Sequence, residues 1–531
     1  MTATEPEQSG GLTRRHALRG GAGVLVGLGI APAFWRTGRA NAALPVTPGN
    51  GPYGELGPAD ANGIMLPQGF SSKVVAQGHV PVAGTGYVWH DFSDGAATFA
   101  TPDGGWILVN NSETLAIVGG GASAIRFNRS GAVTDAYRIL GDTSANCAGG
   151  RTPWGTWLSC EETDDGRVWE CDPTGARPAQ ARLALGRFSH EAAAVDPEGQ
   201  AVYLTEDQGD GGLYRFTPDD YPDLAKGRLD VAVVAADGQV SWAPVPDPSG
   251  GAANPTRKQV EGMTQFKRGE GIWFDAGVVY VATTSDAKVH ALDTRAQRIT
   301  VVYDKDALPD PPLLNPDNLT VSASGDIFVG EDSGDPDPLD LGIITPEGEV
   351  ARFLKLTGTQ HGSGEAISEV TGPVFDPSGT RLYFSSQRAF GLGQVYEIAG
   401  PFRQKRSSAA PIGGSPALAT PVPAIGLEIP RRRTRRVLLR RGIPVGLTLD
   451  QTAQVTVTAT ATLRIAGQLR TVRLGRLSRD LDRGPEQMRL KLSKRGRDRI
   501  GDRRRLKIIV EVAIRSDGVT RRQRRTLSIR P

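Results

Sequence analysis

A short phrase recurs between Trp106 and Tyr383, and this repeat limits the fold more than any other feature of the sequence. Each copy has a turn, a strand centred on an aromatic residue, and then polar or acidic residues. The central aromatics are Trp106, Trp157, Tyr203, Tyr280, Phe328 and Tyr383, at intervals of 51, 46, 77, 48 and 55 residues. All but one of these intervals fall near the length of a four-stranded propeller blade.

A second apolar strand precedes most of the aromatic strands and ends in a hairpin turn, as in HEAAAVDPEG and TGPVFDPSG. Asp-Pro-x-Gly is a hairpin turn sequence, so each pair predicts a β-hairpin. The fold class is therefore expected to be all-β, with a six-bladed β-propeller over residues 43–400 and almost no helix. A seventh, partial blade from Val74–Val82 is the alternative. The polar insertion around Asp219–Gln259 is expected to be a loop excursion.

Charge divides the chain near residue 400. Residues 401–531 hold 32 basic and 9 acidic residues, whereas residues 1–400 hold 29 basic and 49 acidic ones. Residues 401–423 are rich in Pro, Ala and Ser, which is typical of a linker. Residues 424–531 show alternating strands dense in arginine, which predicts a small basic β-sandwich domain. Its expected partner is an anionic cell-envelope polymer or nucleic acid; a merely solvated surface is the alternative.

Residues 1–42 have the pattern of an export signal. Arg14 and Arg15 form a twin-arginine start, an apolar run follows from Gly20 to Phe34, and Ala40-Asn41-Ala42 gives a cleavage site. The apolar run is too short for a stable membrane anchor. We expect export through the twin-arginine translocase and a mature protein without a transmembrane segment. Its location would be extracellular, periplasmic or associated with the cell envelope.

Residues at the starts of the innermost strands of a propeller converge at one mouth although they are far apart in sequence. Like charges gathered there would raise one another's pKa and repel unless they held cations. Hard oxygen ligands in this number suit Ca²⁺, or a ferric ion if a thiolate joins them. Counting back ten to twelve residues from each aromatic gives Asp94, Cys147 or Asn146, Glu191, Glu270, Asp317 and Thr371.

Acidic pairs also end three of the aromatic strands: Glu161-Glu162, Glu206-Asp207 and Glu331-Asp332. Adjacent side chains on a strand point to opposite faces, so at most one member of each pair is expected to face a given site.

The three cysteines, Cys147, Cys160 and Cys171, are an odd number, so at least one thiol stays unpaired in an exported protein. Taken alone, Cys160 has the pattern of a buried core residue. Cys147 and Cys171 are expected either to pair or to lie buried.

The segments TPWGTWLSCEET, GRFSHEAAAVDPEG, EGMTQFKRGEGIWFDAG, PDNLTVSASGDIFVGEDSG and EVTGPVFDPSGTRLYFSSQR resemble the PhoX-type alkaline phosphatases over about residues 55–400. The resemblance implies a propeller with an iron–calcium cofactor that hydrolyses phosphomonoesters. It implies that Cys160 is the thiolate on ferric iron, with Glu191 and Glu270 as carboxylate ligands. Arg268 would clamp the phosphate and Asn111 would assist as a neutral donor. The calcium ligands that it suggests are Glu113, Glu206, Asp207, Asp317, Glu331 and Asp332.

One departure from the family is the stretch Asn111-Ser112-Glu113, where the family often has Asn-His-Glu. His190 is expected to orient Glu191 or a backbone group rather than to act as a base. Two rival functions remain: a calcium-dependent lactonase or esterase, and a non-catalytic secreted propeller braced by calcium. The second rival predicts metal-dependent stability without turnover.

Overall fold

The computed structural model of the protein describes residues 46–332, 339–362, 367–407, 409–414, 425–430, 432–449, 452–465, 468–482, 484–501, 506–516 and 519–530. The predicted export signal, with Arg14 and Arg15, lies outside the described residues. None of the described helices has the length and hydropathy that a membrane span requires.

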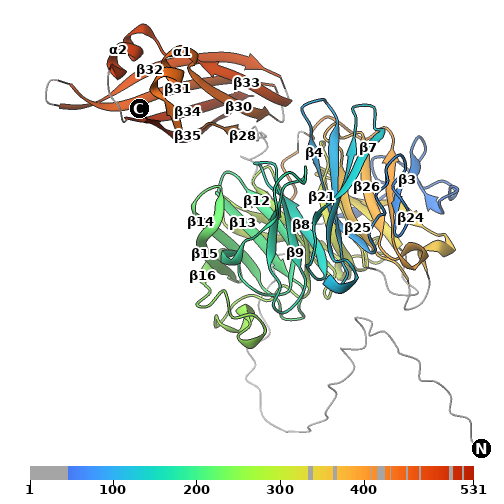
Figure 1. The fold of residues 1–531 in the computed structure, drawn as a ribbon. Coiled ribbons are helices and arrows are strands. Elements are labelled where there is room, and N and C mark those ends of the chain that lie inside the picture. Colours follow the sequence, from blue (N-terminus) through green and yellow to red (C-terminus); the bar gives the residue numbers. More distant parts are fainter. Residues whose placement is uncertain are drawn as a thin grey trace, which may run out of the picture. The chain divides into compact units, whose positions relative to one another are not determined.

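Six sheets form a closed ring. The first strand of each sheet contacts the first strand of the next, and the sixth contacts the first (Figure 1). This topology confirms the all-β, six-bladed propeller. The innermost strands are β4 (Ser93–Ala100), β8 (Asn146–Arg151), β12 (His190–Asp196), β17 (Gly269–Asp275), β21 (Pro316–Val321) and β25 (Val370–Phe375).

The second strand of every blade carries the aromatic residue of the sequence repeat. All six aromatics are at most 4% exposed, because they pack between blades. Burying a side chain of this size contributes about 2–3 kcal/mol each, which explains why the repeat marks the blades. The second strands are β5 (Trp106–Ser112), β9 (Trp157–Glu161), β13 (Ala201–Glu206), β18 (Val278–Thr283), β22 (Ile327–Glu331) and β26 (Arg381–Ser386).

Two further strands complete each blade. The third strands are β6 (Gly121–Phe127), β10 (Val168–Cys171), β14 (Leu213–Asp220), β19 (Lys288–Asp293), β23 (Leu339–Ile344) and β27 (Gln394–Ala399). The outer strands of the first five blades are β7 (Val133–Leu140), β11 (Gln180–Ala181), β15 (Asp223–Val234), β20 (Arg298–Asp304) and β24 (Glu349–Leu356). β1 (Thr47–Pro48) and β2 (Ile64–Met65) both pair with β24. The short 3₁₀ turns are η1 (Ala116–Val118), η2 (Leu183–Leu185), η3 (Gly251–Ala253), η4 (Thr256–Lys258), η5 (Lys305–Ala307), η6 (Thr359–His361) and η8 (Ala389–Gly391).

The sixth blade is completed by a strand from the start of the chain. β3 (Ser71–Gln77) pairs antiparallel with β27, and in Figure 1 this blue strand lies among the orange strands of the last blade. Val74 therefore belongs to blade six, and the alternative of a seventh blade from Val74–Val82 is wrong.

The prediction of a loop around Asp219–Gln259 is wrong as well. Most of it extends blade three, because β15 continues to Val234 and a fifth strand, β16 (Val240–Pro244), pairs with it. Apolar side chains such as Leu229 and Val231 are fully buried there.

The start of the predicted linker packs on the propeller. Arg406 forms an ion pair with Asp275, Ile412 is buried in the cluster around Tyr280, and the Tyr280 hydroxyl donates to the Ile412 carbonyl at 3.2 Å. Residues 415–424 lie outside the described residues.

The C-terminal region is a two-sheet β-sandwich, as predicted. One sheet has the order β28-β30-β33 and the other β29-β35-β34-β31-β32. They enclose one core of Val, Ile, Leu and Ala, with one Met, and no Phe, Tyr or Trp follows Phe402. The elements are β28 (Ile425–Glu428), β29 (Arg432–Thr434), α1 (Arg435–Arg441), β30 (Ile443–Leu449), β31 (Ala453–Ile465), β32 (Gln468–Leu481), β33 (Gly484–Leu490), α2 (Lys494–Ile500), β34 (Leu506–Ser516) and β35 (Val519–Arg530).

Candidate metal centre

Two rings of side chains converge at one mouth of the propeller. The first ring consists of the second residue of each innermost strand: Asp94, Cys147, Glu191, Glu270, Asp317 and Thr371. The second ring consists of the residue after each second strand: Glu113, Glu162, Asp207, Thr284, Asp332 and Gln387. The antiparallel registers place the start of each innermost strand opposite the end of its partner, as for Ser93 with Ser112 and His190 with Glu206. Both rings therefore lie at the same end.

A β-bulge shapes the first ring in every blade. All six innermost strands have a register shift within their first five residues. A bulge re-aims a side chain and increases the local twist. The position that follows each ring residue is small in five blades because the strands crowd the axis. A Cβ at Gly95 would lie 2.4 Å from Cα of Ala148, and one at Gly372 would lie 2.4 Å from the Asp94 carbonyl oxygen.

The rings bring together three groups of metal-ligating side chains: Asp94, Glu113 and Cys147; Cys147, Glu162 and Glu191; and Glu191, Asp207 and Glu270. In each group the ligand atoms lie within 4.8 Å of one another. Cys147 and Glu191 are shared between neighbouring groups, and the Cys147 Sγ lies 3.3 Å from Glu191 Oε1. The groups therefore form one continuous ligand chain across blades one to four.

The electrostatics of the rings fit a cation. Burial and the charges of neighbouring carboxylates raise the pKa of Asp94, Glu191 and Asp317 well above the usual range. Burial and the carboxylates of Asp94 and Glu191 likewise raise the pKa of the Cys147 thiol. Asp94 Oδ1 and Glu191 Oε2 are buried without a hydrogen-bond partner. Buried polar oxygens normally have a partner, and a metal ion would supply one. These acidic clusters could therefore hold a metal.

Arg268 lies at the mouth, where the sequence predicted it. Its backbone has φ of 53°, an uncommon value outside glycine, directly before β17. The guanidinium contacts Asp207 at 2.9 and 3.0 Å, Glu270 at 2.8 Å and Asp332 at 3.4 Å. These carboxylates come from blades three, four and five, and the Arg268 side chain is 26% exposed. A partly exposed guanidinium fixed by three blades is a suitable anion ligand.

Of each acidic pair, the second member joins the second ring and the first does not. Glu206 accepts hydrogen bonds from the Tyr214 hydroxyl at 2.7 Å and from Arg257 at 2.7 Å. Glu331 accepts from the backbone N–H groups of Leu314 and Asn315, and burial raises its pKa to about 8. The structure therefore places Glu206 and Glu331 outside the rings, against their suggested role as calcium ligands.

Cys160 lies in a hydrophobic cluster with Leu158, Val168 and Phe188, and its burial raises the pKa of the thiol. The structure thus brings Cys147 to the carboxylates in place of Cys160. All three cysteines are buried and free, so the expected alternative of a Cys147–Cys171 disulfide is not formed.

Asn111 does not offer a free amide to the mouth. Its Nδ2 donates to the carbonyls of Cys147 and Ala148 at 3.1 and 2.7 Å. Its Oδ1 accepts from Trp157 and Ser159 at 2.9 and 2.8 Å. Asn111 therefore joins the first two blades and holds the strand that carries Cys147.

His190 also has a bracing position. Its Nε2 lies 3.2 Å from the Gly186 carbonyl, and burial lowers its pKa to about 3. A neutral imidazole bound to the backbone agrees with the expectation that it orients its surroundings.

Sequence reasoning missed several groups at the mouth. Gln387 Nε2 donates to Asp94 at 2.5 Å and to Glu113 at 2.6 Å, and Arg388 pairs with Glu369 at 2.5 Å. Gln387 occupies the same repeat position as Asp207, directly after an aromatic strand, and that position was the available signal.

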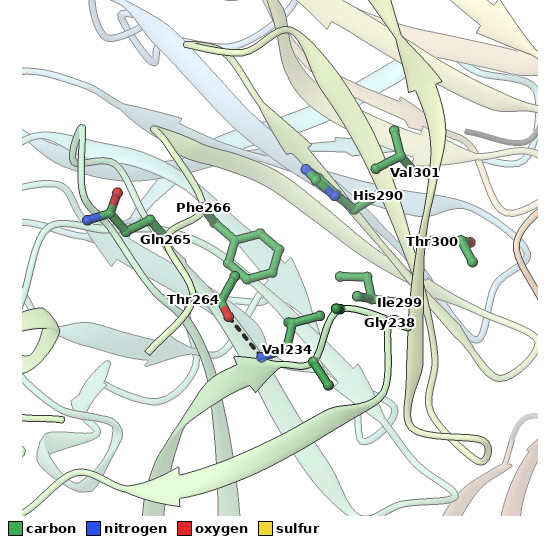
Figure 2. Close-up of a pocket in the computed structure, with 11 residues that line it drawn as sticks. Val234, Gly238, Thr264, Gln265, Phe266, His290, Ile299, Thr300 and Val301 are labelled. Atoms are coloured by element: carbon green, nitrogen blue, oxygen red, sulfur yellow. Dashed lines mark hydrogen bonds between the residues drawn. The ribbon is translucent and has the colours of Figure 1, made fainter. Parts of the chain in front are cut away.

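A separate cavity of about 220 Å³ lies between outer strands of blades three and four. Figure 2 shows Phe266, His290 and Ile299 around it and the hydrogen bond from the Val234 N–H to the Thr264 hydroxyl. None of the ring residues lines this cavity, and burial lowers the pKa of His290 to about 4. It is a mainly apolar pocket between two blades, away from the rings.

The fold and the rings together define a β-propeller with buried, carboxylate-rich clusters at one mouth that could hold a metal. A profile of the family described as alkaline phosphatase PhoX matches residues 108–182 and 164–303. This match confirms the resemblance to the PhoX-type alkaline phosphatases and supports a phosphatase-type function. The matched span contains Glu113, Cys147, Glu162, Glu191, Asp207, Arg268 and Glu270.

No curated protein is significantly similar to the chain in sequence. Among solved structures, the chain is similar to a protein of unknown function from Bacteroides thetaiotaomicron, at 9% identity and TM-score 0.39, covering 65% of this chain and 83% of that one. It is also similar to PorZ, a surface component of the type-IX secretion system of Porphyromonas gingivalis, at 13% identity and TM-score 0.32, covering 84% and 61%. Such scores add nothing to the fold assignment, which depends on the ring of six sheets.

Proposed function

We propose that the protein is an exported, metal-dependent phosphatase that hydrolyses phosphomonoesters at the propeller mouth. The observation that carries the proposal is the meeting of one guanidinium, Arg268, with the linked carboxylate and thiol groups around Cys147 and Glu191. Phosphoryl transfer needs positive charge on the phosphoryl oxygens and in-line positioning more than it needs a protein nucleophile.

The donor set supports a mixed cofactor. Carboxylates without nitrogen ligands suit Ca²⁺, and a thiolate beside them suits iron. We assign Cys147, Glu191 and Glu270 as the iron ligands. The remaining acids of the two rings are assigned to calcium: Asp94, Glu113, Glu162, Asp207, Asp317 and Asp332. When bound, these ions would supply Lewis acidity at the phosphoryl group.

Arg268 would position the substrate. A guanidinium can bind two phosphate oxygens at once, with directional hydrogen bonds. Its carboxylate contacts hold it in place before substrate arrives. Cations bound to Asp207 and Glu270 would weaken these ion pairs and leave the guanidinium to the phosphate.

The test is hydrolysis of p-nitrophenyl phosphate by the full-length protein, with iron and calcium measured on the same sample. We expect Cys147→Ala to lose iron and turnover, whereas Cys160→Ala keeps both. We expect Arg268→Ala to keep the metals and lose turnover by about 10²–10³-fold. Arg295→Ala is its matched control, because Arg295 pairs with Glu198 away from the rings.

Two outcomes would favour the rival functions. A full metal complement without turnover of any ester indicates a calcium-braced binding protein. Hydrolysis of lactones or carboxylic esters in place of phosphomonoesters indicates the calcium-dependent lactonase or esterase.

Export by the twin-arginine translocase is part of the proposal. It is supported by the Arg14-Arg15 pair and the Ala40-Asn41-Ala42 site in the sequence. Replacing both arginines by lysine should leave the protein in the cytoplasm, whereas Arg19→Lys in the same segment should not. Equal export of both variants would contradict this route.

The basic sandwich is proposed to bind an anionic polymer of the cell envelope. One face of the β31, β32 and β34 strands carries Arg473, Arg476 and Arg515 around a shallow depression. Threonines 456 and 458 lie between them and add hydroxyl donors. Clustered guanidinium groups on an open sheet suit repeated anionic groups.

A further inference from the structure

Exposed apolar side chains gather at the mouth that carries the two rings. Eight large hydrophobic side chains are exposed among the described residues, and six of them lie in three loops of blades six and one. We call these six the apolar rim: Val80, Val88, Leu115, Ile117, Val118 and Phe390. Single exposed apolar residues are ordinary, but a group of them on neighbouring loops indicates a contact surface.

The three loops form one unit. The Gly78 N–H donates to the Gly393 carbonyl at 3.0 Å and the Phe92 N–H donates to the Leu392 carbonyl at 2.8 Å. The Glu113 N–H in turn donates to the Phe92 carbonyl at 3.0 Å. Backbone hydrogen bonds thus join residues 78–92, 113–120 and 387–393 around the edge of the mouth.

The apolar rim adjoins the rings through the chain itself. Leu115 follows the ring residue Glu113 by two positions, and Phe390 follows the ring residue Gln387 by three. Their Cα atoms therefore lie within about 8 and 11 Å of those ring residues, the limits set by chain geometry. The Glu113 and Gln387 side chains themselves meet at 2.6 Å.

Phe390 is held outward at a conformational cost. Its φ is 53° and its side chain is 58% exposed. A bulky residue in this region is an outlier that persists only when its surroundings impose it. The positive φ belongs to a tight turn, in which the Leu392 N–H donates to the Ala389 carbonyl at 3.1 Å and Gly391 also has a positive φ, of 77°. Burial does not account for a phenyl ring at the first central position of this turn.

The phosphate site and the apolar rim lie on different sides of the mouth. Arg268 belongs to blade four and the rim to blades six and one, and the ring contacts run in the order one to six. An alcohol on a phosphate bound at Arg268 would therefore have the rim across the mouth from it. We propose that the apolar rim binds the alcohol portion of the substrate and selects phosphomonoesters with an apolar alcohol, an inference that rests on the proposed function.

The test compares n-octyl phosphate, kept below its micelle concentration, with glycerol 2-phosphate, which has the same phosphate on a polar alcohol. For the full-length metal-loaded protein we expect kcat/KM to favour octyl phosphate by roughly tenfold or more, the equivalent of two buried methylenes. Combining Ile117→Ser with Phe390→Gly should bring the ratio toward one. Glycine suits the positive φ at position 390, so this variant relieves strain instead of adding it.

Ile509→Ser is the matched control, because Ile509 is exposed in the C-terminal sandwich and its replacement should leave the ratio unchanged. Equal kcat/KM for the two substrates would overturn the inference while leaving the phosphatase intact. A preference seen only for a phosphomonoester whose alcohol carries long acyl chains, presented in phosphatidylcholine vesicles, would also overturn the inference. It would indicate that the rim contacts a membrane. Absence of all turnover would contradict the proposed function. Calorimetric binding of octyl phosphate then tests the rim separately. A rim variant that binds octyl phosphate as tightly as the parent protein would contradict the inference about the rim.

Discussion

The propeller and the sandwich treat like charges in opposite ways. The propeller gathers carboxylates inward, so that Asp94, Glu191 and Asp317 are at most 4% exposed and repel one another. The sandwich places its arginines on outer strand faces, while apolar residues such as Val457 and Val512 fill its core. Buried like charges need a bound counterion, whereas exposed ones are screened by water and salt. The comparison agrees with the two proposals made above, a metal cofactor for the propeller and a macromolecular partner for the sandwich.

The largest effect is expected from a carboxylate shared by two ligand groups. Glu191→Gln should lower the metal content, because it removes a charge from two ligand groups at once. Phosphomonoester turnover should fall by more than about a thousandfold. Glu511→Gln in the sandwich, where Glu511 pairs with Arg524 on the surface, should change neither. Metal retention in Glu191→Gln would break the comparison.

Breaking an ion pair should cost more stability in the propeller than in the sandwich. Arg257→Ala leaves the buried Glu206 carboxylate without its 2.7 Å partner, which should destabilise the propeller by about 3–5 kcal/mol. Arg524→Ala removes an exposed pair and should cost at most about 0.5 kcal/mol. Denaturant unfolding followed by tryptophan fluorescence measures the first, since all eight tryptophans precede residue 274, and calorimetry measures the second.

The pH dependence of the metal-free protein sharpens the contrast. The raised pKa values of Asp94, Glu191 and Asp317 mean that the folded state holds protons more tightly than the unfolded one. Stability should therefore fall as the pH rises from about 4, by up to about 1.4 kcal/mol per pH unit for each group that must ionise.

Added calcium should reverse that trend, because binding favours the ionised carboxylates. The melting temperature of the chelator-treated protein, followed by tryptophan fluorescence at pH 5 and pH 8 with and without Ca²⁺, gives the answer. A metal-free protein that is more stable at pH 8 would contradict the burial of mutually repelling carboxylates.

The smallest expected effect concerns the cationic sheet face. Reversing Arg473, Arg476 and Arg515 to Glu should lower the salt concentration at which the protein leaves immobilised heparin, a polyanion without phosphoesters. The loss should be roughly tenfold or more in affinity at low salt and should shrink as salt rises. Reversing Arg126, Arg129 and Arg177 on the propeller is the control. Equal effects would mean that only net charge matters.

Much of the fold could be predicted because each blade repeats one local pattern. Trp157 and Tyr203 mark hairpins whose strands are neighbours in sequence, and local pairing leaves a periodic trace. The strand β3 could not be placed this way, because its partner β27 lies at the other end of the propeller sequence. The extension of blade three by β16 was not predicted, because the polar turns on either side of this strand gave the segment the composition of a loop.

The position of the candidate metal centre was predictable from the sequence, but not every side chain that meets there. The repeat located Asp94, Cys147 and Glu191 at one phase, since identical blades present identical positions. The role of Cys160 came from the family resemblance, and the structure places Cys160 in the blade core, as its own pattern indicated. The choice between Asn146 and Cys147 stayed open because the bulge at the start of β8 decides which of them faces the mouth. Nothing local in the sequence records that irregularity.

The strand that closes the sixth blade has a consequence for how the protein is made. Gln77 and Gln394 are hydrogen-bonded although 317 positions separate them. The propeller ring cannot close while the ribosome is still synthesising the last blade. Complete folding must therefore wait for nearly the whole propeller sequence. Contacts this distant also make folding slow. Closure this late in synthesis agrees with the proposal that the chain folds before it is exported.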